Sequence, residues 1–216
     1  MKPDHVENFS LYTASGYRKY LNCAERNRVL VAMGKLRADQ RLFALTLAWT
    51  GGRVSEVLGL MPSSFQVEAC MVSIRTLKRR RPTIREVPVP PDLMDDLEAH
   101  LALSVRQRDP RVTDRRLWPW HRTTAWRNIK RVMMAVGLSG LRATPRGLRH
   151  AFGVITMQAG VPPNIRQKWL GHARPETTSI YSDACGPEEM NFAERFWLSC
   201  DQRQKTGSHE RRPVLL

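Results

Sequence analysis

The sequence predicts one mainly α-helical domain that carries a small antiparallel β-sheet, an α+β arrangement. Apolar residues recur at spacings of three to four over most of the 216 residues, which is the period of an amphipathic helix. Short β-prone runs, by contrast, gather between residues 64 and 89. Glycine and proline mark the ends of the segments, and no internal repeat or low-complexity linker interrupts them.

The N-terminal part of the chain predicts three successive helices. A helical spacing of apolar residues begins at Tyr20. Residues 41–49 are apolar on almost every side, so this segment is predicted to be a central core helix. It stops at the Thr-Gly-Gly sequence of residues 50–52, and residues 54–60 predict a further helix that ends before Pro62.

The β-prone runs are residues 64–67, 71–76 and 84–89. The last two are separated by LKRRRPT, residues 77–83, which is too charged to lie in a core. Two such runs around a polar loop are typical of a β-hairpin. The sequence therefore predicts a small antiparallel sheet whose hairpin tip carries a run of consecutive cations.

The C-terminal part predicts helices with short connections. Asp92 is expected to cap the first of them, and residues 106–116 form a charged connector. Thr144 and Pro145 mark the clearest boundary, because threonine caps helices well and proline suits the first helical position. The predicted helices are 92–104, 123–136, 145–158, 162–170, 176–183 and 188–200.

The domain limits follow from these segments. Residues 1–16 are polar without a reliable period and predict an N-terminal extension. Residues 17–200 predict the folded domain, and the polar residues 201–216 predict a disordered tail. The length suits one domain with a substantial core.

The balance of charge indicates a polyanionic partner. The chain has 35 Lys and Arg against 20 Asp and Glu, a net charge of +15. Such an excess disfavours the compact state by self-repulsion unless a polyanion shares the surface. Most of the cations are arginines, whose planar fork binds phosphate in a bidentate way. Nucleic acid is the first candidate partner, and an anionic membrane surface is the second.

Other sequence features argue against metals, disulfides and membrane spans. The four cysteines lie far apart and form no CxxC pair, which predicts neither a metal site nor a disulfide framework. The N-terminus has no apolar signal region, and no run approaches the roughly eighteen apolar residues of a membrane helix. We therefore expect a reduced, cytoplasmic protein with no metal, no cofactor and no membrane association.

Taken one at a time, the conspicuous polar residues have ordinary structural explanations. Arg53 and Glu56 can pair on one face of a helix, and the cationic hairpin tip can be a solvated turn. His172 can be a polar residue just past a helix end. Tyr181 can be a half-buried core tyrosine. A functional assignment therefore depends on their order and spacing.

The order and spacing of five sequence blocks resemble the tyrosine recombinase (phage integrase) family. The blocks are TGGRVSEVLGL, the basic hairpin with its lysine, TPRGLRHAFG, WLGH and TTSIYSDA. The resemblance extends from about Tyr20 to Phe196 and covers the catalytic domain alone. Family members usually carry a DNA-clamping domain before the catalytic one. The resemblance here begins near the start of the sequence, so the chain is similar to short members such as the fimbrial-switch invertases.

The family's catalytic signature can be carried across residue by residue. Its positions fall on Arg53, Lys78, Arg146, Arg149, His172 and Tyr181. The resemblance implies that Tyr181 attacks phosphorus and forms a 3′-phosphotyrosyl bond. That bond preserves the free energy needed for resealing, so neither metal nor ATP is required. Lys78 would act as the general acid that protonates the leaving 5′-oxygen.

The remaining positions would bind the phosphate and the DNA. The resemblance implies that Arg53 and Arg149 hold the non-bridging oxygens and that His172 donates a further hydrogen bond. Glu56 would orient Arg53 from behind. The hairpin residues expected to contact DNA are Arg79, Arg80 and Arg81.

One position departs from the family's pattern, which usually has histidine where this chain has Arg146. A histidine can take the tyrosine proton, whereas a guanidinium cannot, because its pKa lies above about 12. Either Arg146 lowers the pKa of Tyr181 and binds phosphate, while water or His150 receives the proton, or the substitution marks a slow enzyme.

Three functions are compatible with this reading. The first is a site-specific recombinase that inverts, excises, integrates or resolves DNA segments. The second is a relaxing enzyme of the type IB topoisomerase kind, and the third is a non-catalytic DNA-binding regulator on the same fold. The expected partners are double-stranded DNA and further copies of the chain, as a dimer to tetramer on DNA.

Overall fold

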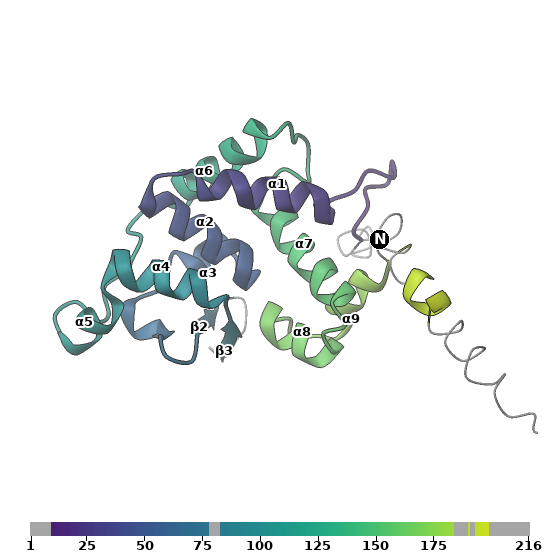
Figure 1. The fold of residues 1–216 in the computed structure, drawn as a ribbon. Helices are drawn as coiled ribbons and strands as arrows, with labels where there is room; N and C mark the ends of the chain where they lie inside the picture. The colour runs from purple at the N-terminus through teal and green to yellow at the C-terminus, as the bar shows by residue number, and fades with distance from the viewer. Residues whose placement is uncertain (1–9, 78–82, 184–189, 191–192, 199–216) are drawn as a thin grey trace, which may run out of the picture. The chain divides into compact units, whose positions relative to one another are not determined.

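Helix α2 (Ala38–Thr50) lies at the centre of the computed structural model and contacts α1 (Cys23–Gly34), α4 (Pro91–Leu101) and α7 (Pro145–Gln158) (Figure 1). The structure describes residues 10–77, 83–183, 190 and 193–198. The prediction of a central core helix is confirmed, because most side chains of α2 from Leu42 to Thr50 are buried. The helix begins earlier than the apolar run, with a polar first turn that contains Asp39, and an acidic residue suits this end of a helix.

Helix α1 begins at Cys23, later than the apolar spacing that starts at Tyr20. Asn22 is its N-cap: its side chain accepts a hydrogen bond from the Glu25 N–H at 2.8 Å. The Glu25 carboxylate accepts the Asn22 N–H in return at 3.0 Å. This capping box sets the start of the helix, and Tyr20 is buried just before it.

The small sheet has the predicted arrangement. Strands β1 (Phe65–Gln66), β2 (Met71–Thr76) and β3 (Thr83–Pro88) pair antiparallel in that order, after the short 3₁₀ helix η2 (Pro62–Ser64). Val72 pairs with Val87 and Ile74 with Arg85, so these side chains share the buried face. The hairpin tip, residues 78–82, lies outside the described residues.

The predicted helix 92–104 is in fact two helices. Helix α4 ends at Ala102, whose φ of 47° lies in the left-handed region, and α5 (Leu103–Arg108) continues into the predicted connector. The prediction that Asp92 caps α4 is wrong: Pro90 is the N-cap, and Asp92 lies in the first turn, where it complements the helix dipole. Alanine seldom adopts a left-handed conformation, so an alanine at position 102 does not indicate a break between two helices.

The other helices agree closely with the predicted segments. They are α3 (Val54–Val57), α6 (Arg122–Ala135), α7, α8 (Pro163–Leu170), α9 (Glu176–Ser179) and the 3₁₀ helix η3 (Ile180–Asp183). Only α3 is markedly shorter than predicted, since the chain turns at Leu58 and Gly59. In Figure 1, α8 and α9 lie next to α7, and β3 packs against α8.

The start of α7 is confirmed in detail. Thr144 Oγ1 accepts a hydrogen bond from the Gly147 N–H at 3.1 Å, and Pro145 occupies the first helical position. This local boundary fixes where α7 begins and therefore the turn on which each of its later residues lies. Helix α7 also contacts η3, so residues far apart in the sequence meet along it.

The chain divides into two compact units, Met1–Asp183 and Ala184–Leu216. The described residues of the second unit, Met190 and residues 193–198, are helical and fall within the predicted segment 188–200. The domain limits 1–16, 17–200 and 201–216 stay predictions. Among the described residues, the structure contains no helix with the length and apolar character needed to cross a membrane.

Candidate active site

Side chains from separate segments of the chain meet around Tyr181, which lies in η3. Arg146 and Arg149 lie on α7, His172 follows α8, and Arg53 precedes α3. The charges of the three arginines all act on the Tyr181 phenol, and the His172 ring stacks on it. Four predicted residues fall outside the described part of the chain, so their roles stay predictions: Lys78, Arg79, Arg80 and Arg81.

Arg53 is held at the turn between α2 and α3. Gly51 ends α2 in the left-handed conformation, with φ of 59°, and Arg53 is the N-cap of α3. The Arg53 backbone N–H and its Nη1 both donate to the Glu56 carboxylate, at 3.0 and 2.8 Å. The Arg53 side chain remains 28% exposed. It is therefore held by Glu56 while the side chain stays partly exposed.

Glu56 pairs with a second arginine as well. Arg85 Nη2 donates to Glu56 Oε2 at 2.7 Å, and both side chains are buried. Burial by itself raises the pKa of Glu56, but the positive charges of Arg85 and Arg53 outweigh it and hold the pKa below its ordinary value. Glu56 is thus ionised at neutral pH and balances two cations.

Arg85 is a site residue that the sequence reasoning missed. From β3 its Nε donates to the Trp169 carbonyl at 2.7 Å and its Nη1 to Thr76 Oγ1 at 2.9 Å. The first bond joins the sheet to the end of α8, and the second links β3 to β2. The sequence contained a signal for a buried arginine. Side chains alternate along a strand, so Arg85 shares the buried face with the apolar Val87.

Arg149 bridges α2 and α8 from its place on α7. Its Nη1 donates to the Gly51 carbonyl at 2.7 Å and its Nη2 to the Leu170 carbonyl at 2.5 Å. Burial, and then the positive charge of Arg53, lowers the pKa of Arg149 to about 9. The guanidinium therefore still carries its charge at neutral pH.

The last turn of α8 is completed by these arginines. An α-helix leaves its last four carbonyls without partners inside the helix. The backbone N–H groups of Gly171 and His172 bind the first two of these carbonyls in α8. Arg85 and Arg149 bind the other two. The end of the helix and the two guanidinium groups therefore position one another.

His172 lies directly after this helix end. Its Nδ1 is 2.9 Å from Thr178 Oγ1, and its ring lies nearly parallel to that of Tyr181, at 11° with 6.1 Å between ring centroids. Burial, followed by the positive charges of Arg149 and Arg53, lowers the pKa of His172 to about 3. The imidazole is therefore neutral at physiological pH.

Tyr181 packs against α7 at a glycine. A Cβ atom on Gly153 would overlap the Tyr181 ring, so a larger residue leaves no room for it. Tyr181 is 1% exposed. Burial raises the pKa of its phenol, and the nearby cations, led by Arg149 and Arg53, offset part of that rise.

Arg146 reaches Tyr181 through a histidine. Arg146 Nε donates to His150 Nε2 at 3.3 Å, one turn along α7, and His150 Nδ1 lies 3.5 Å from the Tyr181 oxygen. Burial, and then the positive charges of Arg146 and Arg149, lowers the pKa of His150 to about 3. The sequence named His150 as one candidate for the proton acceptor, but it did not show which nitrogen faces the tyrosine.

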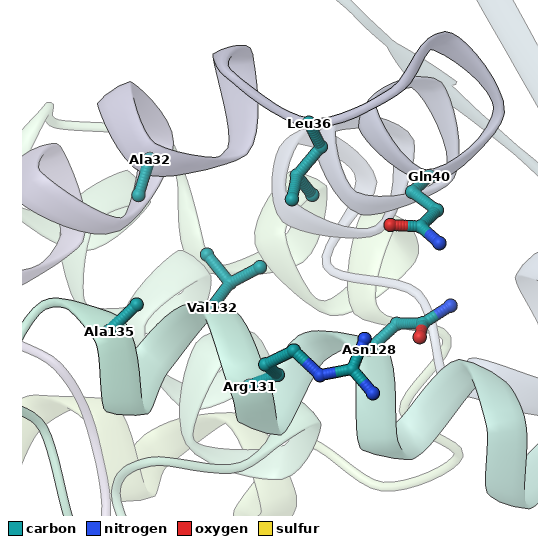
Figure 2. Close-up of a pocket in the computed structure, with 7 residues that line it drawn as sticks. All are labelled: Ala32, Leu36, Gln40, Asn128, Arg131, Val132 and Ala135. Carbon is teal, nitrogen blue, oxygen red and sulfur yellow. The ribbon is translucent and has the colours of Figure 1, made fainter.

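A hollow of about 170 Å³ lies elsewhere, between α1, α2 and α6 (Figure 2). Its lining is largely apolar and includes Leu36 and Val132, with Arg131 at its edge. None of the predicted site residues lines it. The hollow is therefore separate from the cluster around Tyr181.

The cluster combines cations and hydrogen-bond donors with one nucleophilic hydroxyl. Guanidinium groups bind oxyanions in a bidentate way, and a tyrosine oxygen can attack an electrophilic phosphorus. Among the described residues there is no group of three His, Cys, Asp or Glu side chains that could hold a metal ion. The guanidinium groups and the tyrosine hydroxyl together suit a phosphodiester.

Sequence comparison places these residues in a known context. Residues 19–185, a range that contains every predicted site residue, match the model of the phage integrase family. The tyrosine recombinase XerA of Pyrococcus furiosus is 30% identical over 185 residues, which cover 82% of this chain and 61% of XerA. The chain spans 56 to 61% of the length of four XerA sequences from Pyrococcus and Thermococcus species.

Solved structures share the fold. XerH recombinase bound to a palindromic difH substrate, in a post-cleavage complex, has a TM-score of 0.65 and 21% identity, covering 82% of this chain and 53% of XerH. The catalytic domain of bacteriophage HP1 integrase has a TM-score of 0.56 and 22% identity, covering 82% of this chain and 94% of that domain. The predicted fold class is thereby confirmed, whereas the likeness to fimbrial-switch invertases stays a prediction.

Proposed function

Since this chain belongs to the phage integrase family, we propose that it is a site-specific recombinase that cleaves and rejoins double-stranded DNA through a 3′-phosphotyrosyl intermediate. One observation carries the proposal: Arg53, Arg149 and His172 come from separate segments, and all act on Tyr181. Inversion, excision, integration and resolution are all outcomes of this chemistry.

Arg53 and Arg149 bind the two non-bridging oxygens of the scissile phosphate. A guanidinium has five N–H donors, and Arg149 uses two of them on the carbonyls that hold it, so others can serve the phosphate. Arg53 adds a partly exposed cation held by Glu56. Together they neutralise the charge that builds up on the phosphate in the transition state.

His172 donates a hydrogen bond to the phosphate through Nε2. The hydroxyl of Thr178 faces His172 Nδ1 and can donate to that nitrogen when it is unprotonated. The proton of the neutral ring then lies on Nε2. Thr178 is therefore proposed to set the tautomer that His172 needs.

Tyr181 forms the new bond to phosphorus while the bond to the 5′-oxygen breaks. Lys78, in the basic hairpin, protonates that oxygen as it leaves. The phosphotyrosyl ester keeps the free energy of the broken ester, so resealing needs neither ATP nor a metal ion.

The buried tyrosine implies a movement before cleavage. Because Tyr181 is 1% exposed, a phosphate cannot reach its oxygen in the arrangement described. Helix α9 and the 3₁₀ helix η3 that carries Tyr181 are four residues each, short enough to shift without unfolding a core helix. We expect DNA binding to bring the oxygen and the arginine pair to the same phosphate.

Double-stranded DNA is bound by a homo-oligomer in this proposal. One tyrosine cuts one strand, so exchanging both strands of two duplexes takes four tyrosines. Two dimers, one on each duplex, supply them when they assemble into a tetramer. The net charge of +15 supports binding to the DNA backbone. Affinity should then fall steeply with salt, because bound phosphates release counterions.

A nicked suicide substrate tests the proposal, because the short 5′ fragment diffuses away and traps the covalent adduct. The parent chain should form an adduct that survives denaturation, whereas Tyr181→Phe should bind DNA equally well and form none. Arg53→Ala should cleave at least about a hundredfold more slowly, the usual effect of removing a transition-state charge donor. Arg28→Ala, which removes an exposed arginine of α1, is the matched control.

The outcomes separate the alternatives. An adduct in Tyr181→Phe would remove Tyr181 from the nucleophilic role, and near-normal cleavage by Arg53→Ala would contradict the phosphate clamp. No adduct in the parent, with tight DNA binding, would favour the non-catalytic regulator. Relaxation of supercoils without a preferred site would favour the topoisomerase-like enzyme.

A further inference from the structure

A chain of hydrogen bonds runs along one face of α7 to the Tyr181 oxygen. Arg146, His150 and Gly153 share this face because they are separated by four and then three residues. Arg146 Nε lies 3.3 Å from His150 Nε2, and His150 Nδ1 lies 3.5 Å from the Tyr181 oxygen. The missing Cβ of Gly153 lets the tyrosine ring approach. The imidazole therefore touches the nucleophile on one side and a cation on the other.

The chemistry of arginine decides the tautomer of His150. A guanidinium nitrogen only donates hydrogen bonds, so His150 Nε2 must be the acceptor and carry no proton. Burial and the neighbouring cations keep the pKa of His150 at about 3, so the ring is neutral and holds a single proton. That proton lies on Nδ1, the nitrogen that faces Tyr181.

We propose that His150 is a catalytic residue that donates its Nδ1 proton in a hydrogen bond to the Tyr181 oxygen and stabilises the attacking phenolate. Arg146 is the positioning residue that holds His150 in the required tautomer. This inference rests on the proposed role of Tyr181 as the nucleophile. It decides between the two proton acceptors considered above, since a nitrogen that already carries a proton cannot receive another from the tyrosine.

The proton balance follows directly. Tyr181 gives its proton to water, and His150 keeps its own throughout. The phenolate oxygen then bonds to phosphorus, the bond to the 5′-oxygen breaks, and that oxygen takes up a proton from the general acid. The contact between His150 and the tyrosine is long at 3.5 Å, and such contacts commonly shorten in the reacting complex. The proposal requires that the shift of η3 on DNA binding keeps this contact.

Other charged groups also act on this pair. The side chains that influence the Tyr181 phenol or His150 electrostatically, or stack on the phenol, are Lys19, Arg53, Arg146, Arg149, Arg166 and His172. All of these groups, including Arg149 with its pKa of about 9, are the same in every variant at position 150. A difference in phenol pKa between two variants at position 150 therefore reports the contact at that position.

The tautomer can be measured on the unaltered full chain. With ¹⁵N-labelled histidine, the nitrogen shifts and their couplings to the ring protons show which nitrogen carries the proton. The His150 signals are assigned by their loss in His150→Asn. A neutral ring protonated on Nδ1 at pH 7 is the expected result, and a ring protonated on Nε2 would overturn the proposal.

The effect on the phenol is measured with a ring-fluorinated tyrosine at position 181, followed by ¹⁹F NMR against pH. Asparagine and leucine have nearly the same shape, but only asparagine keeps an N–H near the position of Nδ1. His150→Leu should raise the phenol pKa by about one unit or more, the usual effect of losing a hydrogen bond to a charged group. His150→Asn should stay close to the parent value.

Single-turnover cleavage of the nicked substrate supplies the kinetic test. His150→Leu should be about tenfold slower near neutral pH, with the deficit shrinking as the pH rises and phenolate forms without help. His150→Asn should stay within a few-fold of the parent. An equal loss of cleavage rate in His150→Leu and His150→Asn would overturn the proposal. If the pH dependence of the rate also changed, His150 would be a base. If the pH dependence stayed the same, His150 would have a packing role. If the parent itself forms no adduct, the proposed function fails, while the two NMR measurements still decide the tautomer and the contact.

Discussion

Arg149 is a buried cation that donates hydrogen bonds to the backbone carbonyls of Gly51 and Leu170. Carbonyl dipoles offset only part of the cost of burying a charge, so positive potential remains available to a phosphate. Arg85 differs, because the carboxylate of Glu56 neutralises it directly. These two arginines thus differ: Arg149 is the one proposed to bind the phosphate, whereas Arg85 holds the sheet against α8.

The prediction for a single residue concerns Arg146. If it acts as a fixed cation and holds His150, Arg146→Lys should keep appreciable activity and Arg146→Ala should lose about tenfold or more. Arg146→His restores the family's usual residue, yet it should not exceed the parent by much near neutral pH, because it removes the donor to His150 Nε2. The parent rate should show no titration from position 146 between about pH 5 and 8.

The measurement is single-turnover cleavage of a nicked substrate by the parent and the three variants across this pH range. A histidine variant many-fold faster than the parent would show that Arg146 is a catalytic defect. An alanine variant with full activity would show that Arg146 has no role.

At the scale of elements, the β2–β3 hairpin connects two parts of the proposed mechanism. Arg85 on β3 binds the end of α8, which in turn carries His172 next to Tyr181. The tip of the same hairpin carries Lys78. The proposed general acid therefore belongs to the same hairpin as Arg85, and its role can be tested separately.

Lys78→Ala should slow cleavage of ordinary DNA by about two orders of magnitude or more, starting from the lower end of the usual range for losing a general acid. Replacing the 5′-bridging oxygen with sulfur should restore most of the rate, because a thiolate leaves without a proton. The control is Arg79→Ala, which should weaken binding to both substrates and gain nothing from sulfur. Lack of rescue in Lys78→Ala would make Lys78 a DNA-binding residue and assign the acid elsewhere.

At the scale of the whole molecule, buried neutral histidines make stability depend on pH. His150 and His172 have pKa values of about 3 in the folded protein, against 6.5 as the ordinary value. Below about pH 6.5 the unfolded chain binds protons that the folded chain does not, so acid favours unfolding. The ionised Glu56 acts in the same direction, because its lowered pKa contributes stability that is lost as the pH falls.

The free energy of unfolding should therefore fall between about pH 6.5 and 4, by roughly 1.4 kcal/mol per pH unit for each proton taken up. His150→Asn should reduce this slope by one proton, because it removes a buried neutral imidazole. Urea unfolding at several pH values measures the slopes. Identical slopes in the parent and His150→Asn would contradict the burial of a neutral imidazole.

Local chemistry in the sequence determined most elements of the fold. Thr144 and Pro145 fixed the start of α7, because a cap and a proline act on their own helix turn without help from distant residues. Alternation and a charged loop predicted β2 and β3, and the apolar run around Phe43 predicted the central helix. The family's blocks also pointed to the positions of Arg53, Arg149, His172 and Tyr181, since their order along the chain is visible in the sequence.

The tertiary structure alone decided how these positions interact. Arg85 became part of the site because Glu56 and the end of α8 meet β3, and none of these is its neighbour in the sequence. The tautomer of His150 depends on which nitrogen faces Arg146 and which faces Tyr181, a matter of side-chain orientation on packed helices. Sequence spacing places residues on a helix face, whereas directed hydrogen bonds between distant segments exist only after those segments have packed together.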